Sequence, residues 1–364
     1  MTGHQAALQE LDRYARMCVR HSYDQYARHG TLHSKAEKAF EDPNVWKHKW
    51  VPDDFDIGEA RNHPVFQHSF SPEQQLAWNH LQWGMEYTVV AQGERQIIVL
   101  NNYAVRQYKD VLPSIVDLEH RESYEEVDHI QAFEVVLEGL RSRYFPHKAG
   151  ALWSKPASGF GSNRLNSVVR HTIGVAAEKM LGANFPVLFF LTRGLKTHNF
   201  KPFENAIATF DDGHEGMKMI SHLHRLDESR HMATALYIAR LSTEVLDTLP
   251  RESQFLFKMA VKAAFPANRQ ADYRLSYWKT VLDEAVIFQD IPRAERDALF
   301  DHITTRTHAN LTHLHDRQTH LTRQANKRII EECALSPEFK RLFVAQMRKD
   351  PVYKNLVDAV ELPN

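Results

Sequence analysis

The sequence contains two copies of the pattern E-x-x-H, and this pair constrains the fold more than any other feature. The copies are Glu126/His129 in "SYEEVDH" and Glu228/His231 in "HRLDESRH", and their glutamates lie 102 residues apart. Each residue of an α-helix advances by 100°, so residues three or four apart share one face. His224 therefore joins the second motif within about 60° of arc and about 10 Å of helix length. We expect two helices that present metal ligands to one interior.

Apolar residues recur at helical intervals along most of the chain, in segments rich in Ala, Leu, Glu, Gln and Arg. "SPEQ", starting at Ser71, is typical of a helix start, with an N-cap serine, a proline in the first turn and Gln74 placed for a capping box. No segment has the pattern of a β-strand. The sequence predicts an all-α protein with helices at about 5–28, 71–108, 114–143, 163–197, 213–245, 252–265, 270–289, 293–334 and 336–350.

The expected helices form a single domain over residues 1–364. Its core is a four-helix bundle at about 71–245, followed by additional helices at 252–350. Residues 1–70 cover the bundle, and within them 31–70 are expected to be irregular because they contain Pro43, Pro52 and Pro64.

Composition and charge exclude several classes of protein. Hydrophobic residues make up 43% and charged residues 25%, as in soluble globular proteins, and the formal net charge of −1 gives no basis for binding nucleic acid or an anionic membrane. The most apolar stretch, "FPVLFFL", is too short to span a bilayer. Cys18 and Cys333 are too few for a disulfide framework, so we expect a cytoplasmic protein. The 22 histidines favour metal binding without locating a site.

Two E-x-x-H helices, with one glutamate from each of two further helices, are the pattern of di-iron and di-manganese carboxylate bundles. Carboxylates suit iron, and imidazole adds neutral ligands. Glu125 and Asp227 precede the two motif glutamates, and we expect them to accept the second ring N–H of the ligating histidines. Glu126 lies 12 residues beyond Ser114, and counting back a comparable distance before the turn at Val111 and Pro113 leads towards Glu94 on the first bundle helix. We therefore prefer Glu94 to Glu86 as the third carboxylate.

The fourth carboxylate is expected on the third bundle helix. Glu178 is the only acid between Arg143 and Phe203, and its apolar surroundings require a partner of positive charge. "THNFKPFENAIATFDDG" (197–213) is interpreted as a loop inserted between Glu178 and His224, because it contains Pro202 and a "DDG" turn. Glu178 is preferred, and His198 remains the alternative ligand.

These residues resemble the ferritin-like di-iron oxygenases over about residues 80 to 240. "DESRHM", and Glu178 followed by "NFPVL", are similar to bacterial multicomponent monooxygenase hydroxylases. The pattern H-x-x-x-E-x-x-H that starts at His224 instead resembles the p-aminobenzoate N-oxygenase family, in which an extra histidine completes a seven-ligand di-iron site. That resemblance implies a ferritin-like bundle, a homodimer and oxidation of amine nitrogen. It also implies the ligand set Glu94, Glu126, His129, Glu178, His224, Glu228 and His231.

The sequence thus predicts an O₂-activating non-haem di-iron oxygenase that acts on a small organic molecule, with N-oxygenation of an amine or arylamine as the preferred reaction. Alternatives are a hydroxylase or desaturase that acts on carbon, and an iron-binding bundle without catalysis. Ligand identity leaves manganese possible in place of iron. Because the sequence contains no flavin, haem or iron–sulfur motif, we expect a ferredoxin or reductase to supply electrons.

Overall fold

The computed structural model describes residues 3–55, 58–148, 181, 184–246, 254–264, 267–310, 320–350 and 353–361. Within these ranges the regular elements are helices, and the only strand-like pairing there is an isolated bridge between Lys49 and Gly213. The prediction of an all-α protein is therefore confirmed for the described part of the chain. None of the helices in these ranges has the length and apolar character needed to cross a membrane.

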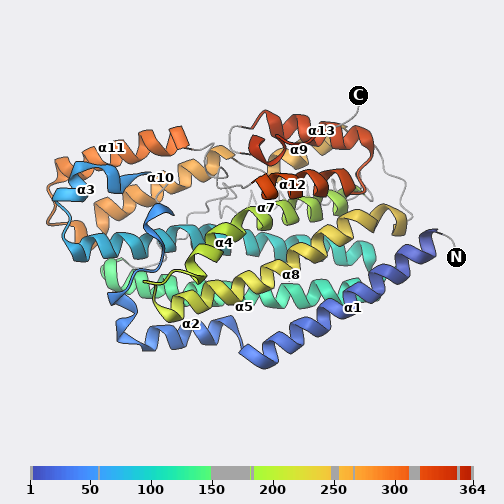
Figure 1. Cartoon of the computed structure of the whole chain (residues 1–364), viewed down its shortest axis with the longest axis horizontal. Coiled ribbons are helices and arrows are strands. Elements are labelled where there is room, and N and C mark those ends of the chain that lie inside the picture. The colour runs from blue at the N-terminus through green and yellow to red at the C-terminus, as the bar shows by residue number, and fades with distance from the viewer. Residues whose placement is uncertain are drawn as a thin grey trace.

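Four long helices form the central bundle, as predicted (Figure 1). They are α4 (Pro72–Tyr108), α5 (Pro113–Tyr144), α7 (Asn184–Ala208) and α8 (Glu215–Val245). The helices α4 and α5 pack as one antiparallel pair, and α7 and α8 pack as a second. The predicted capping box begins α4: the Gln74 amide donates to Ser71 Oγ at 3.2 Å, and the Ser71 amide donates to Gln74 Oε1 at 2.8 Å.

The end of α7 differs from the prediction. The expected loop began at residue 197, but the helix continues to Ala208 with Pro202 inside it. Proline removes one backbone donor, and the extensive packing of the 25-residue helix α7 against α8 compensates for that loss. The "DDG" turn is real, since the Gly213 amide donates to the Phe210 carbonyl at 3.0 Å. The loop interpretation was thus wrong for the first part of the segment, and Glu204 lies on a bundle helix.

The N-terminal segment covers one side of the bundle. Helices α1 (Gly3–His29) and α2 (Leu32–Glu41) both pack against α5 and α8. The prediction that residues 31–70 are irregular was wrong for α2, which Thr31 caps by accepting from the Ser34 amide at 3.2 Å. The rest of this segment contains the short helix α3 (Pro64–His68) and single turns of 3₁₀ helix at Pro43–Lys47, Asp53–Phe55 and Ala60–Asn62.

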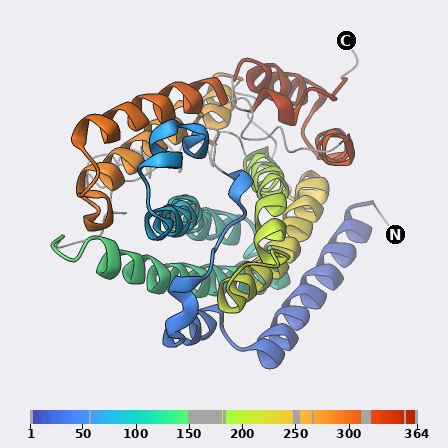
Figure 2. The same ribbon diagram turned by 60° about the vertical axis from the view of Figure 1, so that its left-hand side comes forward.

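The C-terminal helices lie in two groups over the bundle (Figures 1 and 2). Helices α10 (Ala267–Glu284) and α11 (Arg293–Asn310) pack together near α3, and α9 (Gln254–Ala264) packs with α13 (Pro337–Arg348). Helix α12 (His320–Glu332) contacts α7. Two further 3₁₀ turns occur at Val286–Phe288 and Lys354–Leu356. The helix predicted at 293–334 corresponds to α11 and α12 in the described residues.

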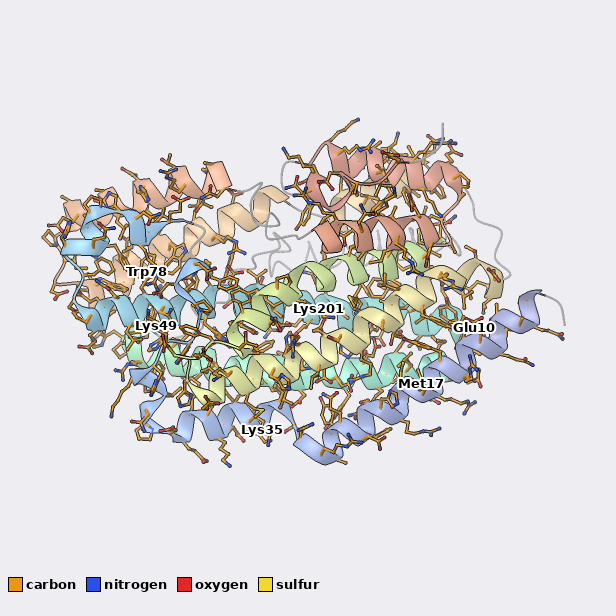
Figure 3. The ribbon with its side chains drawn as sticks, viewed as in Figure 1. Glu10, Met17, Lys35, Lys49, Trp78 and Lys201 are labelled. Carbon is orange, nitrogen blue, oxygen red and sulfur yellow. The ribbon has the colours of Figure 1, made fainter. Side chains whose placement is uncertain are left out.

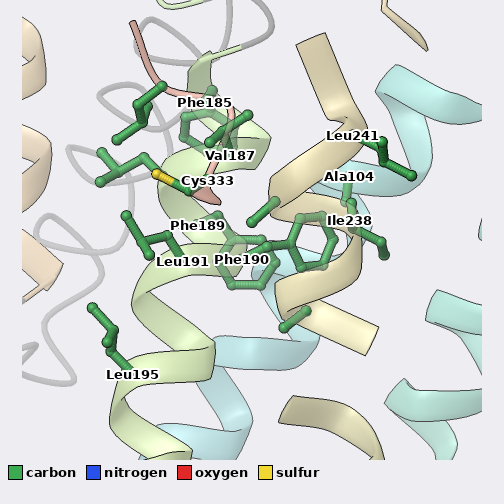
Figure 4. Packing of buried hydrophobic residues seen from close by; sticks show 14 of the residues in the cluster. Ala104, Phe185, Val187, Phe189, Phe190, Leu191, Leu195, Ile238, Leu241 and Cys333 are labelled. Carbon is green, nitrogen blue, oxygen red and sulfur yellow. The ribbon is translucent and has the colours of Figure 1, made fainter. Parts of the chain in front are cut away.

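Buried apolar residues form two clusters, one toward each end of the bundle. Figure 4 shows part of one cluster, to which α7 contributes Phe190 and α8 contributes Ile238 and Leu241. Gly194 allows α7 to approach α8 closely, because a Cβ there would lie 2.6 Å from Leu236 Cδ2. On each bundle helix, a stretch that contributes no residue to either cluster lies between the two clusters. These gaps lie between Ala91 and Tyr103 on α4, Leu118 and Ala132 on α5, Leu195 and Ile207 on α7, and Leu223 and Ala235 on α8. The buried side chains in these four gaps are mostly polar.

Candidate metal centre

Six of the seven predicted ligands meet in the gap between the two apolar clusters. They are Glu94 of α4, Glu126 and His129 of α5, and His224, Glu228 and His231 of α8. None is more than 7% exposed. Ligand atoms of Glu94, His129, His224 and Glu228 lie within 4.8 Å of one another, and so do those of Glu126, Glu228 and His231. Because Glu228 belongs to both groups, the cluster could hold two cations side by side.

Each cluster histidine has one ring nitrogen inside the cluster and the other on a surrounding carboxylate. His129 Nε2 lies 3.1 Å from Asp227 Oδ2, and His231 Nε2 lies 2.7 Å from Glu125 Oε2. Asp227 is on α8 and Glu125 is on α5, so each motif supplies the carboxylate for the histidine of the other helix. These are the contacts expected of Glu125 and Asp227 from the sequence. Such carboxylates fix the tautomer and ring orientation of a ligating histidine.

His224 has a corresponding carboxylate that sequence reasoning missed. Its Nδ1 forms a hydrogen bond with Glu204 of α7, and its Nε2 lies 2.8 Å from Glu94 Oε1. Glu204 is 1% exposed. The sequence contained a signal for this contact. Glu204 is 20 residues before His224, and the two residues lie on opposite sides of the "DDG" turn that joins their helices. The loop assigned to residues 197–213 concealed it.

Three atoms of the cluster, Glu94 Oε2, Glu126 Oε2 and His129 Nδ1, have no hydrogen-bond partner among the residues that the structure describes. His129 Nδ1 lies 3.5 Å from both Glu94 Oε1 and Glu126 Oε2, which is too far for a hydrogen bond. Unsatisfied buried polar atoms are costly, and a cation among them would satisfy all three. The donor set of carboxylates and imidazoles therefore fits iron or manganese.

The charges of the cluster depend on one another. Burial disfavours the charged form of His224, but the carboxylates of Glu204 and Glu94 outweigh burial and raise its pKa to about 10. Burial would raise the pKa of Glu126, and the neighbouring His231, His129 and Arg193 instead hold this pKa well below its usual range. Without a cation, the neighbouring carboxylates therefore favour the protonated form of the imidazoles. A metal would replace those protons.

A buried arginine borders the cluster on the α7 side. Arg193 Nη2 donates to Glu126 Oε1 at 2.8 Å, and Nη1 donates to Glu122 Oε2 at 2.6 Å. Glu119 lies one turn before Glu122 on α5. Burial and the nearby Glu122 raise the pKa of Glu119 well above its usual range. The polar layer therefore extends beyond the six clustered residues.

Glu86, the alternative to Glu94, lies outside the cluster. Its carboxylate forms a two-pronged pair with Arg274 of α10, in which Arg274 Nη2 donates to Glu86 Oε2 at 2.8 Å. This pair holds α10 on α4. The structure therefore places Glu94, and not Glu86, among the histidines.

The seventh predicted ligand, Glu178, lies outside the described residues. Its alternative, His198, lies on α7 between Arg193 and Glu204. Within the described part of α7, the side chains that reach the cluster are those of Arg193 and Glu204. The identity of the ligand from the third bundle helix stays a prediction.

Comparison with known proteins gives one match. Residues 29–207 match the protein-family model described as acyl halogenase, CylC-like. This similarity indicates an enzyme of oxidative chemistry, and it does not single out N-oxygenation. The matched residues include Glu94, Glu126, His129 and Glu204 but end before the motif of α8. No curated protein and no solved structure matches the chain.

Proposed function

We propose that this chain is an O₂-dependent dimetal enzyme, with iron as the preferred metal, that oxidises carbon in an acyl group. The observation that carries the proposal is the buried cluster of six glutamates and histidines, in which each imidazole is oriented by its own carboxylate. The similarity to acyl halogenases supports an acyl substrate. This choice replaces N-oxygenation, the preferred expectation from sequence, with oxidation at carbon.

The protein's own residues have separable roles in this proposal. Glu94, His129, His224 and Glu228 would hold one metal ion, and Glu126, Glu228 and His231 the other. When bound, the metal pair supplies the electrons and the Lewis acidity for O₂ activation. Asp227, Glu125 and Glu204 hold the imidazoles in place and can keep or return protons at their outer nitrogens.

The apolar clusters on the two sides of the centre would limit its contact with water. Trp83, Tyr87 and Phe133 of one cluster are fully buried, and the Phe133 ring centroid lies 5.0 Å from that of His224. A dry surrounding strengthens every electrostatic interaction at the centre and protects a reactive oxidant from side reactions.

The test is a product analysis with a metal-site variant and a matched control. Iron-loaded protein receives a chemical reductant, O₂, chloride and an acyl thioester, and mass spectrometry follows the acyl group. We expect gain of an oxygen atom, exchange of hydrogen for chlorine, or loss of two hydrogens. His231→Ala should abolish the product, whereas His222→Ala, on the same helix but outside the cluster, should retain it. An unchanged acyl group would contradict the proposal.

N-oxygenation is the second candidate, and His224 is the observation that favours it. His224 adds a third imidazole to the two E-x-x-H motifs, as in the N-oxygenase family that the sequence resembles. An arylamine offered under the same conditions separates the candidates, because only an N-oxygenase would convert it to a hydroxylamine or nitro product. A non-catalytic iron-binding bundle would instead leave both substrates unchanged while taking up iron.

A further inference from the structure

A row of tryptophan and tyrosine rings leads from the metal cluster to the N-terminal cover. The ring centroid of Tyr87 lies 6.2 Å from that of His224, and Trp83 stacks on Tyr87 at 4.0 Å. Trp50 lies 6.1 Å from Trp83, and Trp46 lies 5.2 Å from Trp50. These centroid distances correspond to direct contact between neighbouring rings. We call Tyr87, Trp83, Trp50 and Trp46 the aromatic route.

The two ends of the aromatic route differ in their exposure to solvent. Trp46 belongs to the 3₁₀ turn Pro43–Lys47 and is partly exposed. The other three rings are at most 1% exposed. Arg143 lies over the outer end, with its Cζ 4.9 Å from the centroid of the Trp46 ring. The route therefore begins in the dry interior beside His224 and ends at the surface.

The residue types of the route set it apart from the other rings near the centre. Indole and phenol rings lose an electron to a strong oxidant far more readily than the phenyl ring of phenylalanine does. Phe133 also packs against His224, and on the α7 side the other apolar cluster contributes Phe189 and Phe190, but these rings cannot relay an electron in this way. Of the described tyrosines and tryptophans, Tyr87 is the one whose ring packs against a histidine of the cluster.

We propose that the aromatic route carries oxidising equivalents from the metal centre to the surface when O₂ has reacted and no substrate is bound. The inference rests on the proposed function, because the oxidation of an indole needs the strong oxidant that an O₂-activating centre produces. A ferric pair that awaits reduction is too weak an oxidant to take an electron from tryptophan, so the route does not serve ordinary reduction of the metals. Its role is to protect the ligands and the buried side chains around the centre.

Each oxidising equivalent that leaves the centre is balanced by one electron that moves inward. The metal pair gains this electron from Tyr87, which recovers it from the next ring along the route, and Trp46 is left oxidised. The cation of Arg143 disfavours a positive charge on the Trp46 ring, so the indole N–H proton passes to water and a neutral radical remains. A thiol or ascorbate in solution then donates one hydrogen atom, which restores Trp46 and leaves the donor oxidised by one electron.

The first test uses metal-free protein and introduces the oxidising equivalent at the outer end of the route. Lys47 is exposed beside Trp46, and Lys47→Cys places a reactive thiol there, whereas the native Cys18 and Cys333 are buried. The thiol is labelled with a ruthenium polypyridyl complex. A laser flash with an electron acceptor oxidises the complex, which then takes an electron from Trp46. Electron paramagnetic resonance after rapid freezing measures the part of the tyrosyl radical signal that Tyr87→Phe removes.

Two variants interrupt the route, and a third provides the matched control. Trp83→Phe and Trp50→Phe should each abolish the Tyr87 signal, because phenylalanine keeps an aromatic ring in place but does not relay the electron. Trp78→Phe should retain the signal. Trp78 is also buried on α4, stacks on Trp278 of α10 at 3.9 Å, and has no described ring contact with the route (Figure 3). Circular dichroism checks that each variant is folded.

The second test asks whether the metal centre uses the route. Ferrous-loaded protein without excess reductant receives O₂ and no substrate, with catalase present to remove peroxide from solution, and mass spectrometry locates the residues that gain oxygen. Unaltered protein and Trp78→Phe should gain oxygen at Trp46. Trp83→Phe should lose this product and instead gain oxygen at residues next to the cluster, such as Tyr87 and Phe133.

Two results would overturn the aromatic route. One is a Tyr87 signal in Trp83→Phe and Trp50→Phe that equals the signal in Trp78→Phe. The other is equal gain of oxygen at Trp46 in Trp83→Phe and in unaltered protein, because that oxygen would then come from an oxidant in solution. Failure of the proposed function is distinguishable: protein that passes the flash test but gains no oxygen in any variant would keep the route and contradict O₂ activation at the centre.

Discussion

At the scale of single residues, the centre depends on how its histidines are oriented. Each of the three imidazoles contacts an outer carboxylate, and two of these carboxylates come from the opposite motif helix. Misplacement of a single ring would disturb both groups of ligands, because Glu228 is shared between them. Residues that do not ligate are therefore expected to influence metal affinity.

Glu204 offers the sharpest test of this principle. Glu204→Gln should lower metal affinity by about tenfold to a hundredfold, since the amide holds the His224 ring less firmly than the carboxylate. Glu215→Gln is the control, because Glu215 is exposed at the start of α8 and pairs only with Lys218 among the described residues. Competition with a chelator measures both affinities. Equal affinity in the two variants would show that Glu204 does not support the centre.

The motif residues could be predicted because helix geometry places residues three and four apart on one face. Glu94 could also be predicted, because α4 and α5 are joined by a tight turn and residues at comparable distances from that turn lie near one another. Glu204 could not be found by the same reasoning once Pro202 was taken as a helix end. Proline disfavours a helix interior, but the packing of α7 along α8 outweighs that preference.

At the scale of elements, the bundle helices share one plan. Each has apolar residues toward both ends and a polar stretch between them, and the four polar stretches meet at the cluster. The sequence revealed most helix boundaries through caps and prolines. It did not reveal which C-terminal helix contacts which part of the bundle, because such contacts depend on side-chain packing over long sequence separations.

The contact between α4 and α10 should depend on the Glu86–Arg274 pair. Arg274→Met leaves the buried Glu86 carboxylate without its cation and should cost about 3–5 kcal/mol of unfolding free energy. The double variant Glu86→Leu/Arg274→Met should recover most of that loss, because two apolar side chains need no partner. Urea unfolding measures the free energy. Metal content should stay unchanged in the folded variants, and its loss in the double variant would contradict the placement of Glu86 outside the centre.

His80 should make the fold sensitive to acid. It joins α4 to α5 and to the N-terminal cover, with Tyr144 Oη and the His48 carbonyl each 2.8 Å from its ring nitrogens. Burial lowers the pKa of His80 to about 3, against 6.5 for an exposed histidine. The unfolded chain therefore takes up the proton first, and His80 stabilises the fold above pH 6.5 and loses this contribution as the pH falls toward 3.

Below pH 6.5 the contribution of His80 should decline by about 1.4 kcal/mol for each pH unit. His80→Gln has no titrating group at this position, so its unfolding free energy should fall less steeply with acid. Urea unfolding of both proteins between pH 7 and pH 5 gives the two slopes. Identical slopes would mean that His80 does not carry this pH dependence.

At the scale of the whole molecule, the polar layer lies between two apolar clusters and under a helical cover. Helices α1 and α2 lie along α5 and α8, and α1 contributes Ser22, which contacts Glu125, and Gln25, which contacts Asp227. The cover thus takes part in the network around the centre. The family match, which starts at residue 29, includes α2 and leaves most of α1 outside.

The presence of two metal ions in this layer is the central claim, and anomalous X-ray diffraction at the iron edge tests it most directly. Crystals of the iron-loaded protein should give two adjacent iron peaks per chain, enclosed by α4, α5, α7 and α8. One peak should contact Glu94, His129 and His224, the other should contact Glu126 and His231, and Glu228 should reach both. Iron found elsewhere in the molecule, or no ordered iron at this layer, would contradict the account.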